Sequence, residues 1–154
     1  MPFELHNTFE VAVPEDEAFA VLLDVQRVIP CFPGAELVEV IDPQTYRCKV
    51  TVRLGPIALA FRAVATIVES DPAAKRASLN LRGTDEKGRG GTDAVVRFQL
   101  TPAGEGTRVD VATTVNLTGM VAQYGRGAGI IQALASEQTR QFASRLSVIL
   151  SEAP

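Results

Sequence analysis

The chain is short of the residues from which most catalytic and metal sites are built. Its 154 residues include no tryptophan, one histidine and two cysteines. His6 has no cysteine or carboxylate at a motif spacing, which favours a structural or exposed position over a catalytic one. Cys31 and Cys48 lack metal-ligand spacing and are typical of small core residues in a reducing compartment, while a disulfide between them stays open. We therefore expect neither a metal nor a cofactor.

Long apolar runs are also missing. Each purely apolar run is too short to cross a membrane as a helix. The N-terminus has no basic stretch followed by an apolar segment, so we expect no signal peptide. The length suits one domain over residues 1–154, because it can bury one core and is short for two. These features predict a cytoplasmic, single-domain protein.

The basic residues are concentrated in the middle of the chain. A net charge of -3 argues against nucleic acid as the main partner. Residues 1–46 hold one basic and nine acidic side chains, whereas residues 47–97 hold ten basic and five acidic ones. One interpretation is the solvated face of a sheet. The other is a docking surface for an acidic protein or for the inner face of an anionic membrane, with Arg47, Lys49 and Arg53 as the candidate contacts.

Apolar periodicity predicts an α+β fold. A proline and three acids open a predicted helix over residues 14–24, and a second short helix covers residues 25–31. Alternation at period two then predicts a meander of antiparallel strands joined by turn residues. With the first strand included, they are Phe3–Val13, Glu36–Ile41, Thr45–Leu54, Ile57–Glu69, Arg76–Thr84, Gly91–Leu100 and Thr107–Leu117. A helix of roughly thirty residues begins near Thr118 and runs to Leu150.

The alternation separates an apolar face of the sheet from a polar one. In residues 45–54, Tyr46 and Cys48 point one way while Arg47 and Lys49 point the other. The last helix supplies apolar cover through residues spaced at three and four, namely Ile131, Leu134, Ala135, Phe142, Leu146 and Ile149. We therefore expect one curved sheet of about seven strands wrapped around one long helix.

No catalytic motif fills the predicted interior. The sequence has no nucleophile elbow, phosphate-binding loop or zinc spacing. Residues 88–91 are better explained as a hairpin turn than as a phosphate site, because no helix follows them. The polar groups that could reach the interior are Tyr46, Thr113, Gln123 and Tyr124, and they form no obvious acid–base pair. This inventory fits a binding protein better than an enzyme.

The order of elements and four short motifs resemble the carbon monoxide dehydrogenase G-subunit family, which belongs to the START-like, polyketide-cyclase-like superfamily. The motifs are Ile29-Pro-Cys-Phe-Pro-Gly-Ala-Glu36, Leu54-Gly-Pro56 followed by Phe61, Gly83-Thr-Asp-Glu-Lys-Gly88 and Gly119-Met-Val-Ala-Gln-Tyr-Gly-Arg126. The resemblance implies the helix-grip fold, in which a curved antiparallel sheet and a long C-terminal helix enclose a deep apolar cavity.

The resemblance also implies an accessory role. Members of the family accompany molybdenum-containing carbon monoxide dehydrogenases and related oxidoreductases. The implied tasks are membrane association of the enzyme or carriage of a lipophilic electron acceptor such as a quinone. Longer members carry a C-terminal extension thought to contact the membrane. This sequence ends at Pro154, after the predicted helix, so we expect the basic strands to be its membrane surface if it has one.

These observations favour a non-enzymatic carrier of a quinone- or lipid-like molecule. The residues expected to bind the ligand are Pro33, Gly34, Leu54, Leu59, Phe61, Phe98, Leu117, Met120, Tyr124, Gly127 and Ile131. Gly125, Gly127 and Gly129 open the long helix, and each costs it about 1 kcal/mol relative to alanine. We expect them to leave volume for the ligand.

Two alternatives stay open. The first is an enzyme resembling polyketide cyclases or dehydratases, which would need Tyr46, Thr113 and Tyr124 to converge and His6 to turn inward. The second is a pure docking module that binds an oxidoreductase through its basic strands and has a collapsed cavity.

Overall fold

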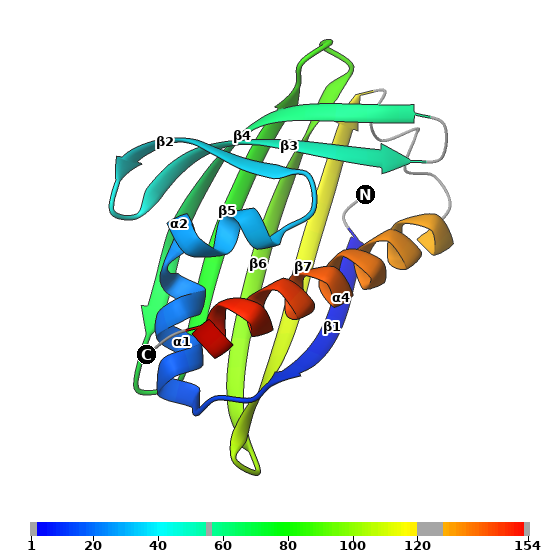
Figure 1. The fold of residues 1–154 in the computed structure, drawn as a ribbon. Coiled ribbons are helices and arrows are strands. Elements are labelled where there is room, and N and C mark those ends of the chain that lie inside the picture. The colour runs from blue at the N-terminus through cyan, green and yellow to red at the C-terminus, as the bar shows by residue number, and fades with distance from the viewer. Residues whose placement is uncertain (1–2, 55–56, 120–127, 153–154) are drawn as a thin grey trace.

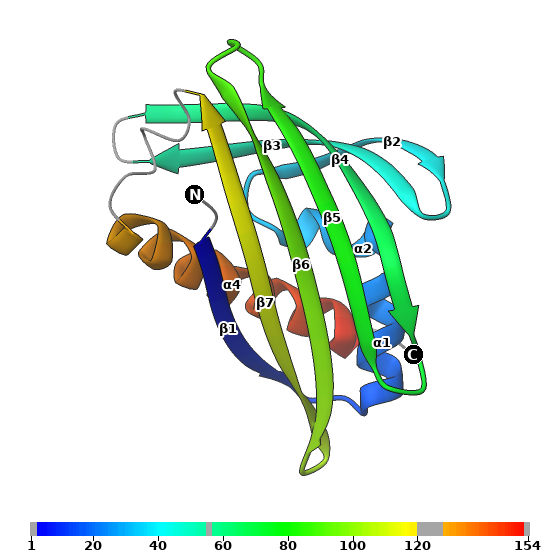
Figure 2. The same ribbon diagram turned by 180° about the vertical axis from the view of Figure 1, so that it is seen from behind.

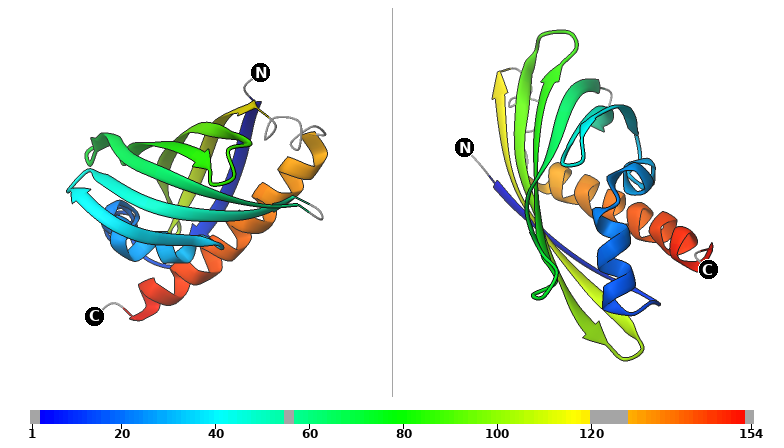
Figure 3. Two further views of the ribbon diagram at one scale, coloured as in Figure 1. Left: turned by 90° about the horizontal axis from the view of Figure 1, so that it is seen from above. Right: turned by 90° about the vertical axis from the view of Figure 1, so that its left-hand side faces the viewer.

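The computed structural model describes residues 3–54, 57–119 and 128–152. One antiparallel sheet forms a layer, and the helices lie against a single face of it (Figure 1 and Figure 2). We call this the inner face and the opposite one the outer face. Further views show the sheet curving around the long C-terminal helix (Figure 3). The predicted α+β helix-grip fold is confirmed.

Seven strands form the sheet, in the order β1-β7-β6-β5-β4-β3-β2. All neighbouring pairs are antiparallel. The bounds of the strands are Phe3–Val11 (β1), Ala35–Asp42 (β2), Thr45–Leu54 (β3), Ile57–Asp71 (β4), Arg76–Asp85 (β5), Gly90–Ala103 (β6) and Gly106–Gly119 (β7). The β5–β6 and β6–β7 hairpins mark opposite ends of the sheet, which are the top and bottom of Figure 1.

The predicted strand over residues 3–13 ends early, at Val11. Its partner β7 begins at Gly106, and Val11 is the last residue of β1 with a partner in the register, which is Thr107. Val13 stays attached by a different bond, because its carbonyl oxygen accepts a hydrogen bond from Thr107 Oγ1 at 2.7 Å.

The short helices follow the predicted ranges closely. Helix α1 spans Glu15–Leu23, with three acids in its first turn that interact favourably with the helix dipole. Helix α2 spans Val25–Val28, and the 3-10 turn η1 spans Ile29–Cys31. The single helix predicted over residues 25–31 is therefore two pieces. Pro30 explains the break, because it has no N–H to continue the α-helical ladder.

The long helix, α4, spans Ala128–Glu152. The strand predicted to end near Thr118 ends at Gly119, where β7 pairs with Gly90. The predicted start of the helix falls between Gly119 and Ala128, outside the described residues. Gly125 and Gly127 lie outside the described residues. None of the helices in the described ranges is long and apolar enough to span a membrane.

The C-terminal half of α4 covers the lower part of the inner face. There Phe142 and Leu146 are buried and Ile149 packs against the same core, as predicted. The side chains of Ile131, Leu134 and Ala135 lie outside the described residues. We call this region the closed core; it contains Val11, Ala18, Phe19, Val21, Leu22, Val28, Cys31, Ala77, Leu100, Val109, Phe142, Leu146 and Leu150.

Candidate functional site

Above the closed core, several inward-pointing apolar side chains are only half-buried, whereas Leu59, Phe61, Ala63 and Ala65 are buried. Leu100 and Val109 in the closed core are 2% and 0% exposed, whereas inner positions farther up the same strands retain accessible surface. We call these positions the open zone, which comprises Val50, Val52, Leu79, Leu81, Ala94, Val96, Val115 and Leu117. Within this zone, Val50, Leu79 and Leu81 pack against a buried cluster that includes Tyr46 and Ala65, and each of the three keeps part of its surface accessible.

Small residues also occupy part of the inner face. Ala63 and Gly83 pair across β4 and β5, and Ala94 faces inward on β6. A Cβ added at Gly83 would meet the Phe61 Cβ and the Thr92 Cγ2 at 3.4 Å, which is ordinary van der Waals contact. The inner face therefore carries little side-chain volume at these positions.

Three of the expected ligand-binding residues come together at the top of the open zone. Leu59 and Phe61 are buried, and Val52 and Leu117 pack against them. Phe98 is separate, because it packs against the closed core. Val52 was missing from the expected ligand-binding residues, although its alternation with Arg53 places it on the apolar face.

Pro33 and Gly34 lie between η1 and β2. Gly34 has φ +82°, and a Cβ there would lie 2.3 Å from the carbonyl oxygen of Thr51. Its own carbonyl accepts a hydrogen bond from Thr51 N at 2.9 Å. Gly34 is therefore required by the close approach of this link to β3, whatever else lies near it.

The remaining expected ligand-binding residues are not placed. Met120, Tyr124 and Gly127 lie outside the described residues, as do the side chains of Leu54 and Ile131. Gly129 belongs to α4.

A buried ion pair lies beside Phe61, and it was not predicted from the sequence. Asp85 is the partner of Phe61 in the register, and its side chain is 0% exposed. Its carboxylate accepts hydrogen bonds from Arg89 Nε at 2.7 Å and Nη2 at 3.1 Å. These bonds lower the pKa of Asp85 to about 2. The sequence did contain a signal for this pair, because Asp85 is an acidic residue at the next inward position after Leu81 and Gly83.

Of the four residues that the enzyme alternative requires, three lie in the described part of the chain. His6 points from the outer face with its side chain 71% exposed, 3.6 Å from Glu4, so it does not turn inward. The Tyr46 hydroxyl donates a hydrogen bond to the carbonyl of Pro43 at 2.5 Å, and burial raises its pKa. Thr113 does face inward. Tyr124 lies outside the described residues.

The two cysteines are free and buried, which resolves the disulfide alternative against a bond. Burial raises the pKa of both thiols. Among the residues that the structure describes, no group of three His, Cys, Asp or Glu side chains is arranged to hold a metal ion.

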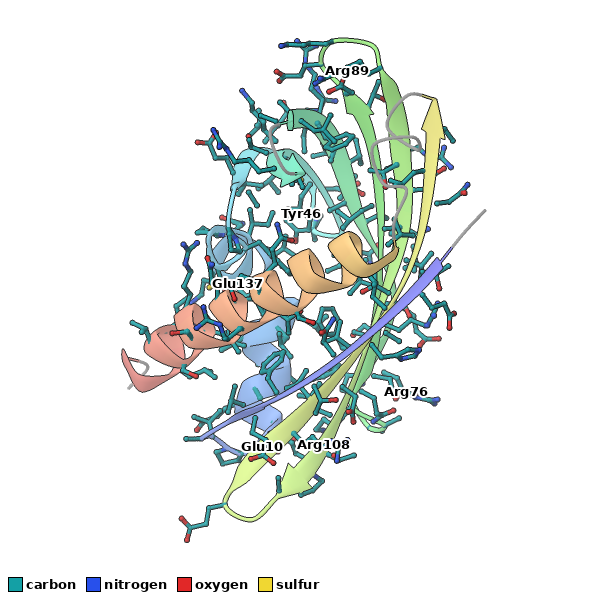
Figure 4. The ribbon with its side chains drawn as sticks, turned by 90° about the vertical axis from the view of Figure 1, so that its right-hand side faces the viewer. Glu10, Tyr46, Arg76, Arg89, Arg108 and Glu137 are labelled. Atoms are coloured by element: carbon teal, nitrogen blue, oxygen red, sulfur yellow. The ribbon has the colours of Figure 1, made fainter. Side chains whose placement is uncertain are left out.

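The outer face is polar. A hollow of about 280 Å³ lies there, bordered by side chains that include His6, Arg76, Arg97 and Asp110. The charged side chains at its border distinguish it from the expected apolar site. Figure 4 labels Arg76 among the side chains on this side of the molecule.

The basic side chains of β3 also lie on the outer face. Arg47 lies 3.8 Å from Glu39 and Lys49 lies 3.7 Å from Glu86, and both basic side chains are about half exposed, at 55% and 44%. Arg53 is exposed on the same face. These basic side chains lie on a solvated face of the sheet, and the same exposed side chains are the ones that the docking interpretation requires.

Comparisons with known proteins agree with this geometry. The family model for the G subunit of carbon monoxide dehydrogenase (CoxG) matches residues 8–147. Comparison with curated protein sequences finds no match. Among solved structures, a conserved protein from Geobacillus kaustophilus is similar over 97% of this chain and 96% of that chain, with a TM-score of 0.83 and 18% identity.

Two enzymes of known structure share the fold. The Zhui aromatase/cyclase from Streptomyces sp. R1128 has a TM-score of 0.66 at 16% identity, over 98% of this chain and 94% of that one. Norcoclaurine synthase from Thalictrum flavum has a TM-score of 0.63 at 14% identity, over 99% and 88%. At identities this low, the structural similarity shows a common fold only, and function must be argued from the residues of the site. Since the family model covers most of the chain, the protein belongs to the carbon monoxide dehydrogenase G-subunit (CoxG) family.

Proposed function

We propose that this chain is a non-enzymatic carrier that holds a quinone- or lipid-like molecule between the inner face of the sheet and α4. The open zone is the observation that carries the proposal, because its apolar side chains face a helix and still retain accessible surface. Sites for such ligands are concave and mostly apolar, with a few polar groups that orient the ligand. Leu59, Phe61 and Leu117 would form the upper wall.

The proposed partner is a molybdenum-containing oxidoreductase of the carbon monoxide dehydrogenase type. Family membership supports this assignment. The carrier would deliver a lipophilic electron acceptor to the enzyme or bring the enzyme to the cytoplasmic side of the membrane. Arg47, Lys49 and Arg53 would contact an acidic surface of that enzyme. The exposed ion pairs of Arg47 and Lys49 within the chain contribute little stability, so these two side chains are available to a partner.

Blocking the open zone tests the carrier. Ala94 is a half-buried inner residue on β6, whereas Ala112 is a half-buried outer residue on β7. Ala94→Phe should weaken binding of the neutral fluorescent probe N-phenyl-1-naphthylamine by about tenfold or more, since the ring occupies the ligand volume. Ala112→Phe makes the same chemical change on the outer face and should bind normally.

Equal binding by the two variants, with both folded by circular dichroism, would count against the carrier. A second measurement uses the wild type alone. Native mass spectrometry and solvent extraction of the purified protein should reveal a bound apolar molecule, and its absence together with no probe binding would overturn the proposal.

Charge reversal tests the docking surface. The triple variant Arg47→Glu, Lys49→Glu and Arg53→Glu should lose salt-sensitive capture of the purified oxidoreductase, because attraction becomes repulsion. Arg108→Glu at the other end of the outer face is the control and should retain capture (Figure 4). Capture that survives the triple reversal would remove the basic strands from the interface. Loss of binding to anionic vesicles instead would indicate a membrane surface.

A further inference from the structure

Two neutral polar side chains, Asn7 and Thr113, lie on neighbouring strands of the inner face, among apolar residues. Asn7 lies between Leu5 and Phe9 in the inward alternation of β1, and Thr113 lies on the neighbouring strand β7. The register pairs Leu5 with Thr113 and Asn7 with Val111, so Asn7 and Thr113 are diagonal neighbours. Such neighbours are about 7–8 Å apart, a span that one ligand head group can bridge.

Both side chains lack a partner within the part of the chain that the structure describes. Asn7 and Thr113 are half-buried, and no described side-chain nitrogen or oxygen is both buried and without a hydrogen bond. Their side-chain polar atoms therefore keep accessible surface. Donors in such a position bind water until a ligand group replaces it.

The pair lies at the floor of the open zone. Phe9, Phe98 and Val111 pack against the closed core at the level of Asn7 and just below it. Val115 and Leu117 continue upward from Thr113 on the same face of β7. Leu117 is four residues from Thr113, or about 13 Å along the strand. A ligand anchored at Thr113 would extend along this surface toward Phe61.

The surroundings of the pair favour an uncharged ligand group. Among the described inner-face positions of the strands, the ionisable residues are Tyr46, Cys48 and Asp85. Burial raises the pKa of Tyr46 and of Cys48, which keeps both neutral at pH 7. Asp85 is occupied by Arg89 and lies about 20 Å along the sheet from the level of Thr113. A charge brought to this floor would meet no counter-ion on the described strands.

We propose that Asn7 and Thr113 bind the head group of the carried molecule, and that this group is a neutral hydrogen-bond acceptor such as a ring carbonyl. The inference rests on the proposed carrier function and names its specificity. The Asn7 amide and the Thr113 hydroxyl each donate a hydrogen bond to the ligand, while the apolar remainder lies against Val115 and Leu117. Each bond should contribute roughly two- to tenfold in affinity.

A matched pair of probes tests the head-group assignment separately from the proposed carrier function. 2,3-Dimethyl-1,4-naphthoquinone carries two carbonyl groups, and 2,3-dimethylnaphthalene has the same ring without them. Neither has an open quinone position at which a thiol could add, which matters because Cys31 and Cys48 are free. The wild type should bind the quinone more tightly than the hydrocarbon.

Three variants locate the polar contact. Thr113→Val keeps the shape and removes the hydroxyl, and Asn7→Leu removes the amide at similar size. Each should weaken quinone binding roughly two- to tenfold and leave hydrocarbon binding unchanged. Thr92→Val is the control, because Thr92 is another half-buried inner threonine, beside Gly83 near the top of the sheet.

The outcomes are distinct. If the wild type binds neither probe, the carrier fails and the assignment fails with it. If both probes bind and the ratio of affinities is the same in wild type, Thr113→Val and Asn7→Leu, the carrier stands and the head-group assignment is overturned. A ratio of quinone to hydrocarbon affinity that changes only in Thr92→Val would also overturn the assignment, because it would place the head group near Thr92 at the top of the sheet. Retained hydrocarbon binding confirms that each variant is folded.

Discussion

The carboxylate of Asp85 and the guanidinium of Arg89 form a two-point ion pair at the turn between β5 and β6, with bonds of 2.7 and 3.1 Å. Arg89 Nη2 also donates to the carbonyl of Ala58 on β4 at 3.3 Å. The pair therefore connects the hairpin to the beginning of β4. Figure 4 labels Arg89 at this end of the sheet. The top of the apolar site is thus held by one buried charge pair.

Asp85→Asn should reduce stability near neutral pH and have less effect in acid. The pKa of Asp85 is lowered from 3.8 to about 2, and such a group contributes stability above its unfolded pKa that is lost as pH falls through its folded pKa. The difference in Tm between wild type and variant should be constant above about pH 5 and shrink between about pH 4 and pH 2. Circular dichroism melting curves over this range measure it.

The control for this experiment is Asp93→Asn. Asp93 pairs with Arg82 at 2.9 Å on the outer face, where the two side chains are 52% and 84% exposed. Exposed ion pairs contribute little to the free energy of unfolding, so the Tm of this variant should be close to that of the wild type at every pH. A Tm difference for Asp85→Asn that stays constant down to about pH 2.5 would show that the ion pair is not its source.

Gly34→Ala should destabilise the chain more than Gly88→Ala. Both glycines have positive φ, at +82° and +71°, so both substitutions introduce backbone strain of about 1–2 kcal/mol. Only Gly34 adds a collision, because its new Cβ would lie 2.3 Å from Thr51 O while nothing lies within 4 Å at Gly88. Urea unfolding of the two variants measures the difference. Equal losses would mean that the link at Gly34 relaxes freely.

Phe32 and Phe142 should be energetically coupled. Their rings stack with centroids 4.3 Å apart, although Phe32 is 37% exposed and Phe142 is 2% exposed. Phe142→Ala should lower the free energy of unfolding by about 3–5 kcal/mol, because it opens the closed core. Phe32→Ala should cost less, and a double-mutant cycle should give a coupling of about 0.5–1.5 kcal/mol. Additive losses would show that the stacking contributes nothing.

The cysteines should react only when the chain unfolds. Cys31 and Cys48 are buried, and burial raises the pKa of each thiol, so little reactive thiolate forms at pH 7. Ellman's reagent should report slow labelling of the native protein and two thiols per chain in guanidinium chloride. Adding a reductant should leave Tm unchanged. A Tm that falls on reduction would indicate a disulfide.

Much of the fold was predictable because side chains on a strand alternate strictly between two faces. Tyr46 and Cys48 are buried while Arg47 is exposed, as the pattern indicated. Asn7 could have been found in the same way, since it occupies an inward position of β1. One polar residue in an apolar face is easily missed when no partner in the sequence draws attention to it.

Alternation does not predict how deeply an inward residue is buried. Phe98 and Leu117 both face inward and were both expected to contact the ligand, yet Phe98 packs against the closed core and Leu117 belongs to the open zone. The difference depends on where α4 and α1 cross the sheet. No period in the sequence encodes that crossing, because it is set by packing between distant segments.

The sequence by itself determined the two-faced strands, their meander and the apolar stripe of the last helix, since each follows from a local repeat of two or of 3.6 residues. Tertiary structure alone decided that Asp85 is neutralised by Arg89 and that Asn7 and Thr113 share the floor of the open zone. These are contacts between side chains whose neighbours are set by pairing register and helix placement. The local alternation of side chains in the sequence does not specify the pairing register or the placement of the helices.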